Sequence, residues 1–456
     1  MTRLLILGAA PLPFETLERQ YAANLRTWHL TQPLLADGHE IRLIACRLPN
    51  TYGDKNSRDP VIRTQEGCMD YFSLTEEAFE SAESLQQMAD EFCPDAIIGV
   101  NTYPASRAAR IDTDKPIWCD LNGWVMAEAQ SKANVYDDNR YLSHFWKMER
   151  SVLERADAIS TVSRPQRFAV IGELAALGRL NKETTGYSFV HWIPNALSEA
   201  DYRHDHEVFR GTVVPSAAFV VLWVGGYNTW TDVDMLFRGL EKAILEIEDL
   251  HFVSTGGAIE GHDDLTFRRF RNRIADSPVK EHFHLMGWVP TEQVPSFYFE
   301  SDLGINIDGQ NYETVFGARN RLNDMLKCGL PILTTRGTEI SEMLAEHRLC
   351  LECAIGDSEA LGSQLAEAAR DRDKLQEMGE RARQFAEEHF SYRRTTEPLL
   401  DWARRPARAP DLGRRAEFED VDFFRGSSVR APTDRKETRG LLQWAFALLV
   451  RNRRDE

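Results

Sequence analysis

Residues 302–335 read DLGINIDGQNYETVFGARNRLNDMLKCGLPILTT, and their pattern indicates the fold class more clearly than any other segment. Apolar residues alternate with small or polar ones over 303–307, as in a strand, and a polar, turn-forming loop follows at 308–311. A charged, helix-like segment comes next, ends with CGLP at 328–331 and is followed by a second apolar run. The order strand, loop, helix, strand predicts a parallel α/β sheet, and such sheets bind ligands at the carboxyl ends of their strands.

The start of the predicted helix favours an anionic ligand. Arg319, Arg321 and Asp324 fall at or near its first turn. Free backbone N–H groups and the helix dipole favour negative charge at that place. We therefore expect an anion to bind beside the two arginines.

Length and charge limit the classes of protein to consider. The chain has 456 residues, which fits two domains of ordinary size and an appendage. With 43% hydrophobic and 27% charged residues, it has the composition of a soluble globular protein. A formal net charge of −17 repels polynucleotides, and the main body shows no strong basic patch, so we expect no nucleic-acid partner.

The cysteines and apolar runs bear on location. Seven cysteines without the dense spacing of a disulfide framework favour a reducing cytoplasm. Cys350 and Cys353 have the spacing of a redox or zinc pair, but a second ligand pair is missing, and we expect neither a metal site nor a cofactor. The apolar run at 4–7 is too short for a signal peptide, and no run reaches the ~18 to 20 residues of a membrane span.

Strand and helix signals alternate through both halves of the chain. Strands are expected at 4–7, 41–46, 96–100, 116–119 and 158–161, and again at 219–224, 251–254 and 282–285. Two doubly wound α/β domains that face a cleft follow from this rhythm, one at 1–190 and one at 191–390. Helical residues 391–402 come next, and the Arg- and Pro-rich composition of 403–456 predicts a flexible tail.

The tail contains a short apolar block. Residues 440–450 read GLLQWAFALLV, with basic residues on both sides. This pattern suits an amphipathic helix in a membrane interface, so 440–454 is a candidate for peripheral contact at the inner face of the membrane. A helix that docks on its own protein or on a second subunit explains the pattern equally well.

Four further motifs accompany the opening segment. They are HWIPNA at 191–196, VGG at 224–226, STGG at 254–257 and LMGWVP at 285–290. In order and spacing they resemble the retaining GT-B glycosyltransferases of family four (glycosyl transferases group 1). The resemblance implies a GT-B fold with an acceptor domain, a nucleotide-sugar domain and, at 391–402, a helix that crosses back to the first domain.

The resemblance also implies which residues contact the nucleotide sugar. Glycine suits these turns because a Cβ would hold the backbone away from a phosphate or a ring. The expected donor-binding residues are Gly225, Gly226, Gly256, Gly257, Trp288, Val289, Arg319, Arg321 and Asp324.

The family's pair of glutamates, eight positions apart, is altered in this chain. Asp324 occupies the second position, which implies a role at the ribose hydroxyls, and a carboxylate can accept from both hydroxyls of a diol. Glu313 is the candidate for the first position, at the donor sugar, but it precedes Asp324 by eleven residues. Phe316-Gly317 resembles the Phe-Gly after the family's first glutamate, which implies two or three extra loop residues.

The family's two diphosphate-binding cations are missing. Gly226 and Thr231 stand where the family has an Arg and a Lys. The leaving group of glycosyl transfer gains negative charge in the transition state and needs compensation. We expect Arg319 and Arg321 to supply the compensating positive charge. Arg321 and Glu313 are also the catalytic candidates of this domain.

The first domain offers fewer candidates. Family members often place a polar residue after the strand at 116–119, facing the donor, and Asp120 and Asn122 are the catalytic candidates at that place. Turn formation explains these two residues equally well. Gly8 and Trp124 are weaker candidates for the acceptor side.

The function implied is a hexosyltransferase-type glycosyltransferase that needs no metal and works with retention. It would act in polysaccharide or glycolipid biosynthesis on a saccharide or lipid-linked acceptor. Two alternatives stay open because the cations are missing and the loop is longer. One is a non-catalytic nucleotide-sugar-binding partner subunit, and the other is another GT-B enzyme such as a sugar epimerase.

Overall fold

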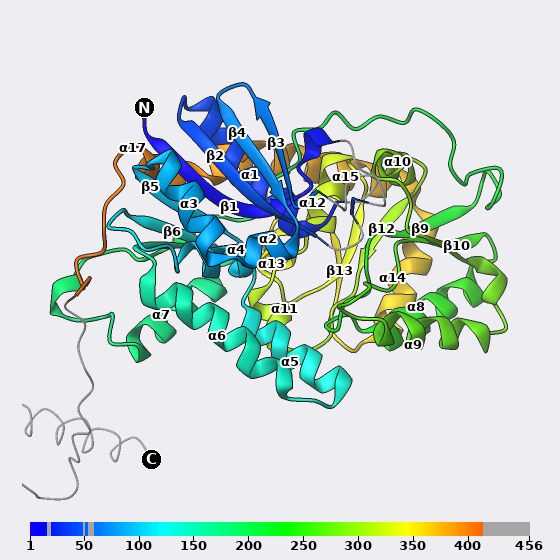
Figure 1. Ribbon diagram of the computed structural model, residues 1–456. Helices are drawn as coiled ribbons and strands as arrows, with labels where there is room; N and C mark the ends of the chain where they lie inside the picture. Colours follow the sequence, from blue (N-terminus) through cyan, green and yellow to red (C-terminus); the bar gives the residue numbers. More distant parts are fainter. Residues whose placement is uncertain (16–19, 49–50, 53–58, 414–456) are drawn as a thin grey trace, which may run out of the picture. The chain divides into compact units, whose positions relative to one another are not determined.

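The computed structural model describes residues 1–15, 20–48, 51–52 and 59–413, and it contains two mainly parallel sheets (Figure 1). The first has the strand order β3-β4-β2-β1-β5-β6-β7-β8. Its strands are β1 (Arg3–Ala10), β2 (Glu40–Arg47), β3 (Val61–Glu66), β4 (Met69–Leu74), β5 (Ala96–Val100), β6 (Ile117–Leu121), β7 (Ala158–Thr161) and β8 (Val190–Trp192). Neighbouring strands are parallel except β3 and β4, which form an antiparallel pair at one edge.

Burial on both faces explains why strands such as β1 and β5 are almost entirely apolar. In β1, Leu5 and Leu7 belong to one core cluster, and Leu4 and Ile6 belong to another. Successive strand residues point to opposite faces, so helices must cover both. The helices of this half are α1 (Ala22–Ala36), α2 (Glu76–Glu80), α3 (Ala82–Phe92), α4 (Thr102–Ala108), α5 (Val125–Tyr136), α6 (Arg140–Arg155) and α7 (Arg164–Ala176).

The second sheet has the order β11-β10-β9-β12-β13-β14, and all its strand pairs are parallel. Its strands are β9 (Phe219–Trp223), β10 (Leu250–Thr255), β11 (Phe283–Gly287), β12 (Leu303–Asn306), β13 (Ile332–Thr335) and β14 (Leu351–Cys353). The chain order reverses between β9 and β12, and a reversal of this kind opens a ligand site at the carboxyl ends of the strands. The prediction of two doubly wound domains is confirmed.

The helices of the second half differ from the prediction in one place. They are α8 (Val233–Glu246), α9 (Leu265–Ala275), α10 (Val294–Phe299), α11 (Tyr312–Phe316), α12 (Asn320–Lys327), α13 (Glu339–Glu346), α14 (Ser358–Arg370) and α15 (Arg372–His389). Residues 302–335 thus contain two helices after β12. Asn311 caps α11 by accepting a hydrogen bond from the Thr314 N–H, and extended backbone at Gly317 ends it. The extra loop residues inferred from the sequence form this short helix.

The border between the two halves lies later than predicted. His191 and Trp192 pair with Ser160 and Thr161 of β7, so they belong to the first sheet and not to the second domain. The chain returns to the first half through α16 (Tyr392–Thr395) and α17 (Glu397–Arg404). Leu399 of α17 lies in the core cluster that contains Leu4 and Ile6.

The predicted tail begins too early in the sequence. Asp411 forms an ion pair with Arg179, at 2.8 Å from Nε to Oδ2, and both side chains are fully buried. Ala409 donates its backbone N–H to Asp157. Residues 405–413 therefore pack on the first half, and the predicted helix at 440–454 lies outside the described residues. In the part of the chain that the structure describes, no helix is long and apolar enough to cross a membrane.

Candidate functional site

The loops after β9, β10 and β11 join at one edge of the second sheet. The backbone N–H of Gly225 donates to the Thr255 carbonyl at 3.1 Å, and that of Gly256 donates to the Gly287 carbonyl at 2.7 Å. Gly256 has φ +87°, and a Cβ there would lie 2.3 Å from the Gly225 carbonyl oxygen. Glycine is thus required for the loops to approach each other.

The structure brings the other predicted turn residues to the same loops. The Tyr227 N–H donates to the Gly257 carbonyl, which links the turn at Gly226 to the next strand's loop. Trp288 Nε1 donates to the Ala258 carbonyl at 3.0 Å. Val289 is partly buried against the core cluster beneath. The predicted donor-binding turns form one continuous surface.

Arg321 places its guanidinium at this surface. It comes from α12, and its Nη2 donates to the Gly226 carbonyl at 2.9 Å. Its guanidinium carbon lies 3.8 Å from the centroid of the Trp223 ring, so the planar group stacks on the indole. Burial lowers the pKa of Arg321 to about 10, which leaves it cationic at neutral pH. A helix thus supplies the positive charge at the loop where Gly226 replaces the family's Arg.

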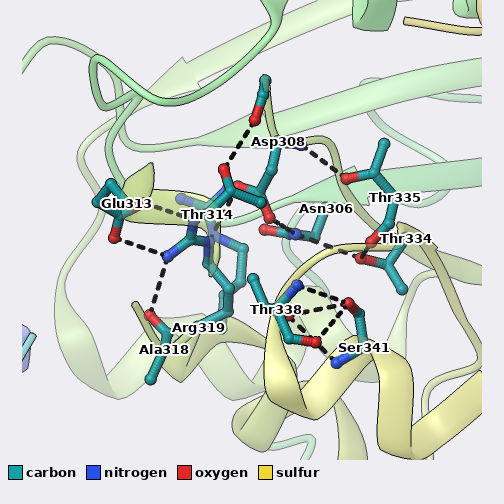
Figure 2. A network of polar contacts seen from close by, with 12 residues as sticks. Asn306, Asp308, Glu313, Thr314, Ala318, Arg319, Thr334, Thr335, Thr338 and Ser341 are labelled. Carbon is teal, nitrogen blue, oxygen red and sulfur yellow. Dashed lines mark hydrogen bonds and ion pairs between the residues drawn. The ribbon is translucent and has the colours of Figure 1, made fainter. Parts of the chain in front are cut away.

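Arg319, by contrast, has two carboxylate partners within the protein. Its Nε lies 2.9 Å from Asp308 Oδ1, and its Nη2 lies 2.7 Å from Glu313 Oε2 (Figure 2). All three side chains are at most 5% exposed. Burial alone would lower the pKa of Arg319, but the two carboxylates raise it above its usual value. We call Asp308, Glu313 and Arg319 the Arg319 triad.

The strands beneath hold the triad in place. Asn306 Nδ2 donates to Asp308 Oδ2 at 2.8 Å, and the Asp308 N–H donates to Thr335 Oγ1 at 2.9 Å (Figure 2). The prediction that Arg319 is a free diphosphate ligand does not fit this pairing. Nor does a donor-sugar contact fit Glu313, because both its oxygens accept from Arg319.

Asp324 lies three residues after Arg321 on α12, and residues at this spacing share a helix face. Its Oδ1 accepts a hydrogen bond from the Tyr202 hydroxyl at 3.0 Å. Burial raises the pKa of Asp324 to about 6. Tyr298 also donates to this carboxylate, and because a carboxylate has about four acceptor positions, it keeps capacity for a further hydroxyl.

The first-domain candidates are less accessible than predicted. Asp120 is fully buried, and Arg26 donates to both its oxygens, at 2.7 and 3.1 Å. Ser160 adds a third hydrogen bond, at 2.7 Å. Because this carboxylate has no surface to offer a ligand, the prediction that Asp120 faces the donor is corrected. Asn122 is half-buried and donates to Asn101 Oδ1 at 3.0 Å.

The two acceptor-side candidates have structural contacts. A Cβ at Gly8 would lie 2.3 Å from Thr27 Cγ2, so glycine is needed for α1 to pack on β1. Trp124 donates from Nε1 to Glu173, and its ring packs edge-on against Phe316 with 4.9 Å between centroids. Ser163 Oγ also donates to the Phe316 carbonyl, at 2.7 Å. Helix α11 therefore contacts the first domain directly.

Sequence reasoning missed Glu128, on α5. Burial, together with the charge of Glu313, raises the pKa of Glu128 to about 8, although Arg319 opposes the shift. The first domain thus contributes a carboxyl group that is mostly protonated at neutral pH and acts electrostatically on the Arg319 triad. The only signal in the sequence is an acidic residue in the first turn of a helix, which is common.

Glu128→Gln is expected to remove a loss of stability that develops between about pH 4.3 and pH 8. The pKa of Glu128 in the folded protein, about 8, lies above the ordinary value for glutamate. The folded state therefore holds a proton that the unfolded state releases, so the free energy of unfolding is highest below about pH 4.3 and falls as pH rises through 8. At pH 9 the variant should be more stable than the wild type by about 1–2 kcal/mol, after allowance for partial exposure. Thermal unfolding between about pH 4.5 and 9 measures this, with exposed Glu77→Gln as the control. Parallel profiles for wild type and Glu128→Gln would contradict the assignment.

Comparisons with known proteins agree with this fold. The model of the glycosyl transferase-like family matches residues 231–401. A search of curated proteins found no match. The fold resembles that of sucrose-phosphate synthase from Thermosynechococcus elongatus, with TM-score 0.63, 14% identity and coverage of 89% of this chain and 98% of that chain.

Two further solved structures are similar. Anabaena HepE in complex with UDP and glucose has TM-score 0.61 and 13% identity, with 88% of this chain and 99% of that chain covered. WaaG, a glycosyltransferase involved in lipopolysaccharide biosynthesis, has TM-score 0.59 and 13% identity, with 88% and 98% covered. The predicted resemblance and fold are confirmed: residues 231–401 match the glycosyl transferase-like family, and the chain has the GT-B fold.

Proposed function

We propose that this chain is a glycosyltransferase that moves a hexosyl group from a nucleotide diphosphate sugar to a hydroxyl of a saccharide or lipid-linked acceptor. The observation that supports it most is the position of Arg321. Its guanidinium lies at the Gly226 carbonyl, beside the glycine turns after β9 and β10. Among the described residues, no carboxylate forms an ion pair with it, so its charge is available to a ligand. HepE, a protein with this fold, was solved with UDP and glucose.

The transition state has a particular need for such a cation. When the bond between the anomeric carbon and the phosphate oxygen breaks, negative charge grows on the diphosphate. An arginine in a partly desolvated site stabilises that charge more than one in water, and it can hold two phosphate oxygens at once. In this proposal Arg321 supplies the compensation together with backbone N–H groups, so no metal is needed for that task.

In this proposal the transferred sugar keeps its anomeric configuration, because the described candidates offer no accessible nucleophile. Among the described candidates, Asp120 and Glu313 have both oxygens engaged by arginine. The acceptor oxygen would therefore attack from the face that the diphosphate leaves. The acceptor proton passes to the departing phosphate oxygen, and the new bond forms with the original configuration. Asp324 would bind the ribose hydroxyls.

A non-catalytic nucleotide-sugar-binding role is the second candidate. It is favoured by the Arg319 triad, in which two buried carboxylates face one guanidinium. If both stay ionised, the triad has a net negative charge that opposes a diphosphate. Arg321 would then be the main cation of the site, and the protein would bind a nucleotide sugar without turning it over.

A panel of donors tests both candidates. The protein is incubated with UDP-, GDP- and ADP-linked glucose, galactose, mannose and N-acetylglucosamine, and binding and release of nucleoside diphosphate are measured. Slow hydrolysis or transfer from at least one donor is expected, and NMR of the product should show the donor's anomeric configuration. Binding without release would support the non-catalytic role instead. Failure of every donor to bind would contradict both.

A further inference from the structure

A cavity of about 1060 Å³ lies beside α11, and the glycines of the turns after β9 and β10 do not line it. Its walls are formed by α5, by residues 229–234, by the beginning of α9 and by residues 309–315. Neither Arg321 nor Asp324 lines it. Ligand pockets typically measure about 300–1,000 Å³. This cavity is therefore large enough for a linear ligand built of several small repeating units.

Aromatic rings and free amides line this cavity. Tyr312 is 58% exposed, and its ring is stacked on Phe316, which holds it in place. Trp230 lines the cavity too, and the guanidinium of Arg319 lies 5.4 Å from its ring centroid. A rigid aromatic ring gives a large contact area at low entropic cost, and it suits the apolar face of a sugar ring.

Three exposed amide side chains add hydrogen-bonding capacity. They are Gln130 and Asn134 of α5 and Gln310 after β12. None of the three makes a side-chain hydrogen bond within the described part of the chain. An amide both donates and accepts, as a sugar hydroxyl does, so the three groups match a ligand rich in hydroxyls.

The charges around the cavity balance one another. Asp234 lies on its wall and pairs with Arg269 and, at 3.0 Å, with Arg273. Asp232 caps α8 by accepting from the Met235 N–H. The remaining charged residue of the lining is Arg238, so acidic and basic groups are equal in number, two against two. This balance favours a neutral ligand over a polyanion.

We propose that this cavity, the α5/α11 groove, binds a neutral oligosaccharide that is the growing acceptor or product chain. The inference rests on the proposed function and specifies its acceptor as a saccharide longer than one unit. Helix α11 connects the groove with the Arg319 triad, because Tyr312 lines the groove and the next residue, Glu313, pairs with Arg319.

Saturation-transfer NMR and calorimetry with four neutral tetrasaccharides test the groove. The probes are maltotetraose, cellotetraose, mannotetraose and tetra-N-acetylchitotetraose, and the full chain is used. At least one should bind, and Tyr312→Ala should weaken it about 3- to 10-fold, as expected for loss of one stacked ring. Gln130→Ala, on the opposite wall, should also weaken it. Phe168→Ala, which removes a 70% exposed ring on α7, is the matched control and should bind as the wild type does.

The outcomes separate this inference from the proposed function. If no tetrasaccharide binds, or if Tyr312→Ala and Gln130→Ala bind as the wild type does, the groove assignment is overturned. Donor hydrolysis that persists in that case leaves the proposed function intact. If the two variants lose oligosaccharide binding while no donor is bound or cleaved, the groove stands and the proposed function fails. Thermal unfolding of each variant confirms that the fold is retained.

Discussion

Arg321→Ala is expected to lower the rate of donor cleavage about 100- to 1,000-fold while the protein stays folded. The guanidinium is the cation at the turn after β9, and it lies 2.9 Å from the Gly226 carbonyl oxygen. Its loss leaves the growing charge of the diphosphate without a positive partner. Release of nucleoside diphosphate measures the rate, and calorimetry with the free nucleotide measures ground-state binding. We expect the rate to fall more than the affinity, because the charge grows in the transition state.

Two further variants make this prediction specific. Arg321→Lys keeps the charge but loses the planar stacking on Trp223 and the two-point hold on phosphate, so an intermediate loss of about 10-fold is expected. Arg408→Ala removes an exposed arginine of the first half, and its rate should equal that of the wild type. A folded Arg321→Ala protein with undiminished turnover would show that the donor site is assigned wrongly.

Arg319→Met is expected to lower the free energy of unfolding by about 3–5 kcal/mol. The substitution keeps much of the side-chain volume but leaves Asp308 and Glu313 without their cation. Both carboxylates are buried, at 3% and 5% side-chain exposure. Urea denaturation followed by tryptophan fluorescence measures the loss.

A double variant separates this structural role from ligand binding. Arg319→Met combined with Glu313→Leu removes one unpaired carboxylate and should recover part of the lost stability. If Arg319 were instead a free phosphate ligand, Arg319→Met would weaken donor binding and leave stability unchanged. Wild-type stability in the single variant would contradict the triad's structural role.

The fold could be predicted from sequence because it depends on local pattern. Buried strands such as β1 and β9 are continuous apolar runs, and glycines mark the turns that approach closely. Arg321 could be predicted as well, since its distance from the CGLP sequence at 328–331 places it in the first turns of α12. These signals lie within short windows of sequence.

The partners of buried charges could not be predicted in the same way. Asp120 pairs with Arg26, 94 residues away, and Asp411 pairs with Arg179, 232 residues away. No local pattern indicates such a pair, so the sequence predicts a ligand contact at Asp120 and places Asp411 in a flexible tail. The shift of the Glu128 pKa likewise depends on burial and on a helix of the other domain.

The carboxylate partners of Arg319 could not be predicted either, although they lie close to it in the sequence. Its position beside Arg321 predicts the same role, yet the separate helix α11 turns Glu313 back toward it. Two arginines two residues apart therefore differ in their surroundings: Arg319 has two buried carboxylate partners, and Arg321 forms no ion pair with a described carboxylate.

The most direct test of the central claim is a crystal structure with the nucleoside diphosphate of the donor that the panel selects. We expect diphosphate oxygens within about 3 Å of the Arg321 guanidinium, at the glycine turns after β9 and β10, with the Arg319 triad intact. A diphosphate bound by Arg319, with Asp308 and Glu313 displaced and Arg321 still on the Gly226 carbonyl, would contradict this expectation.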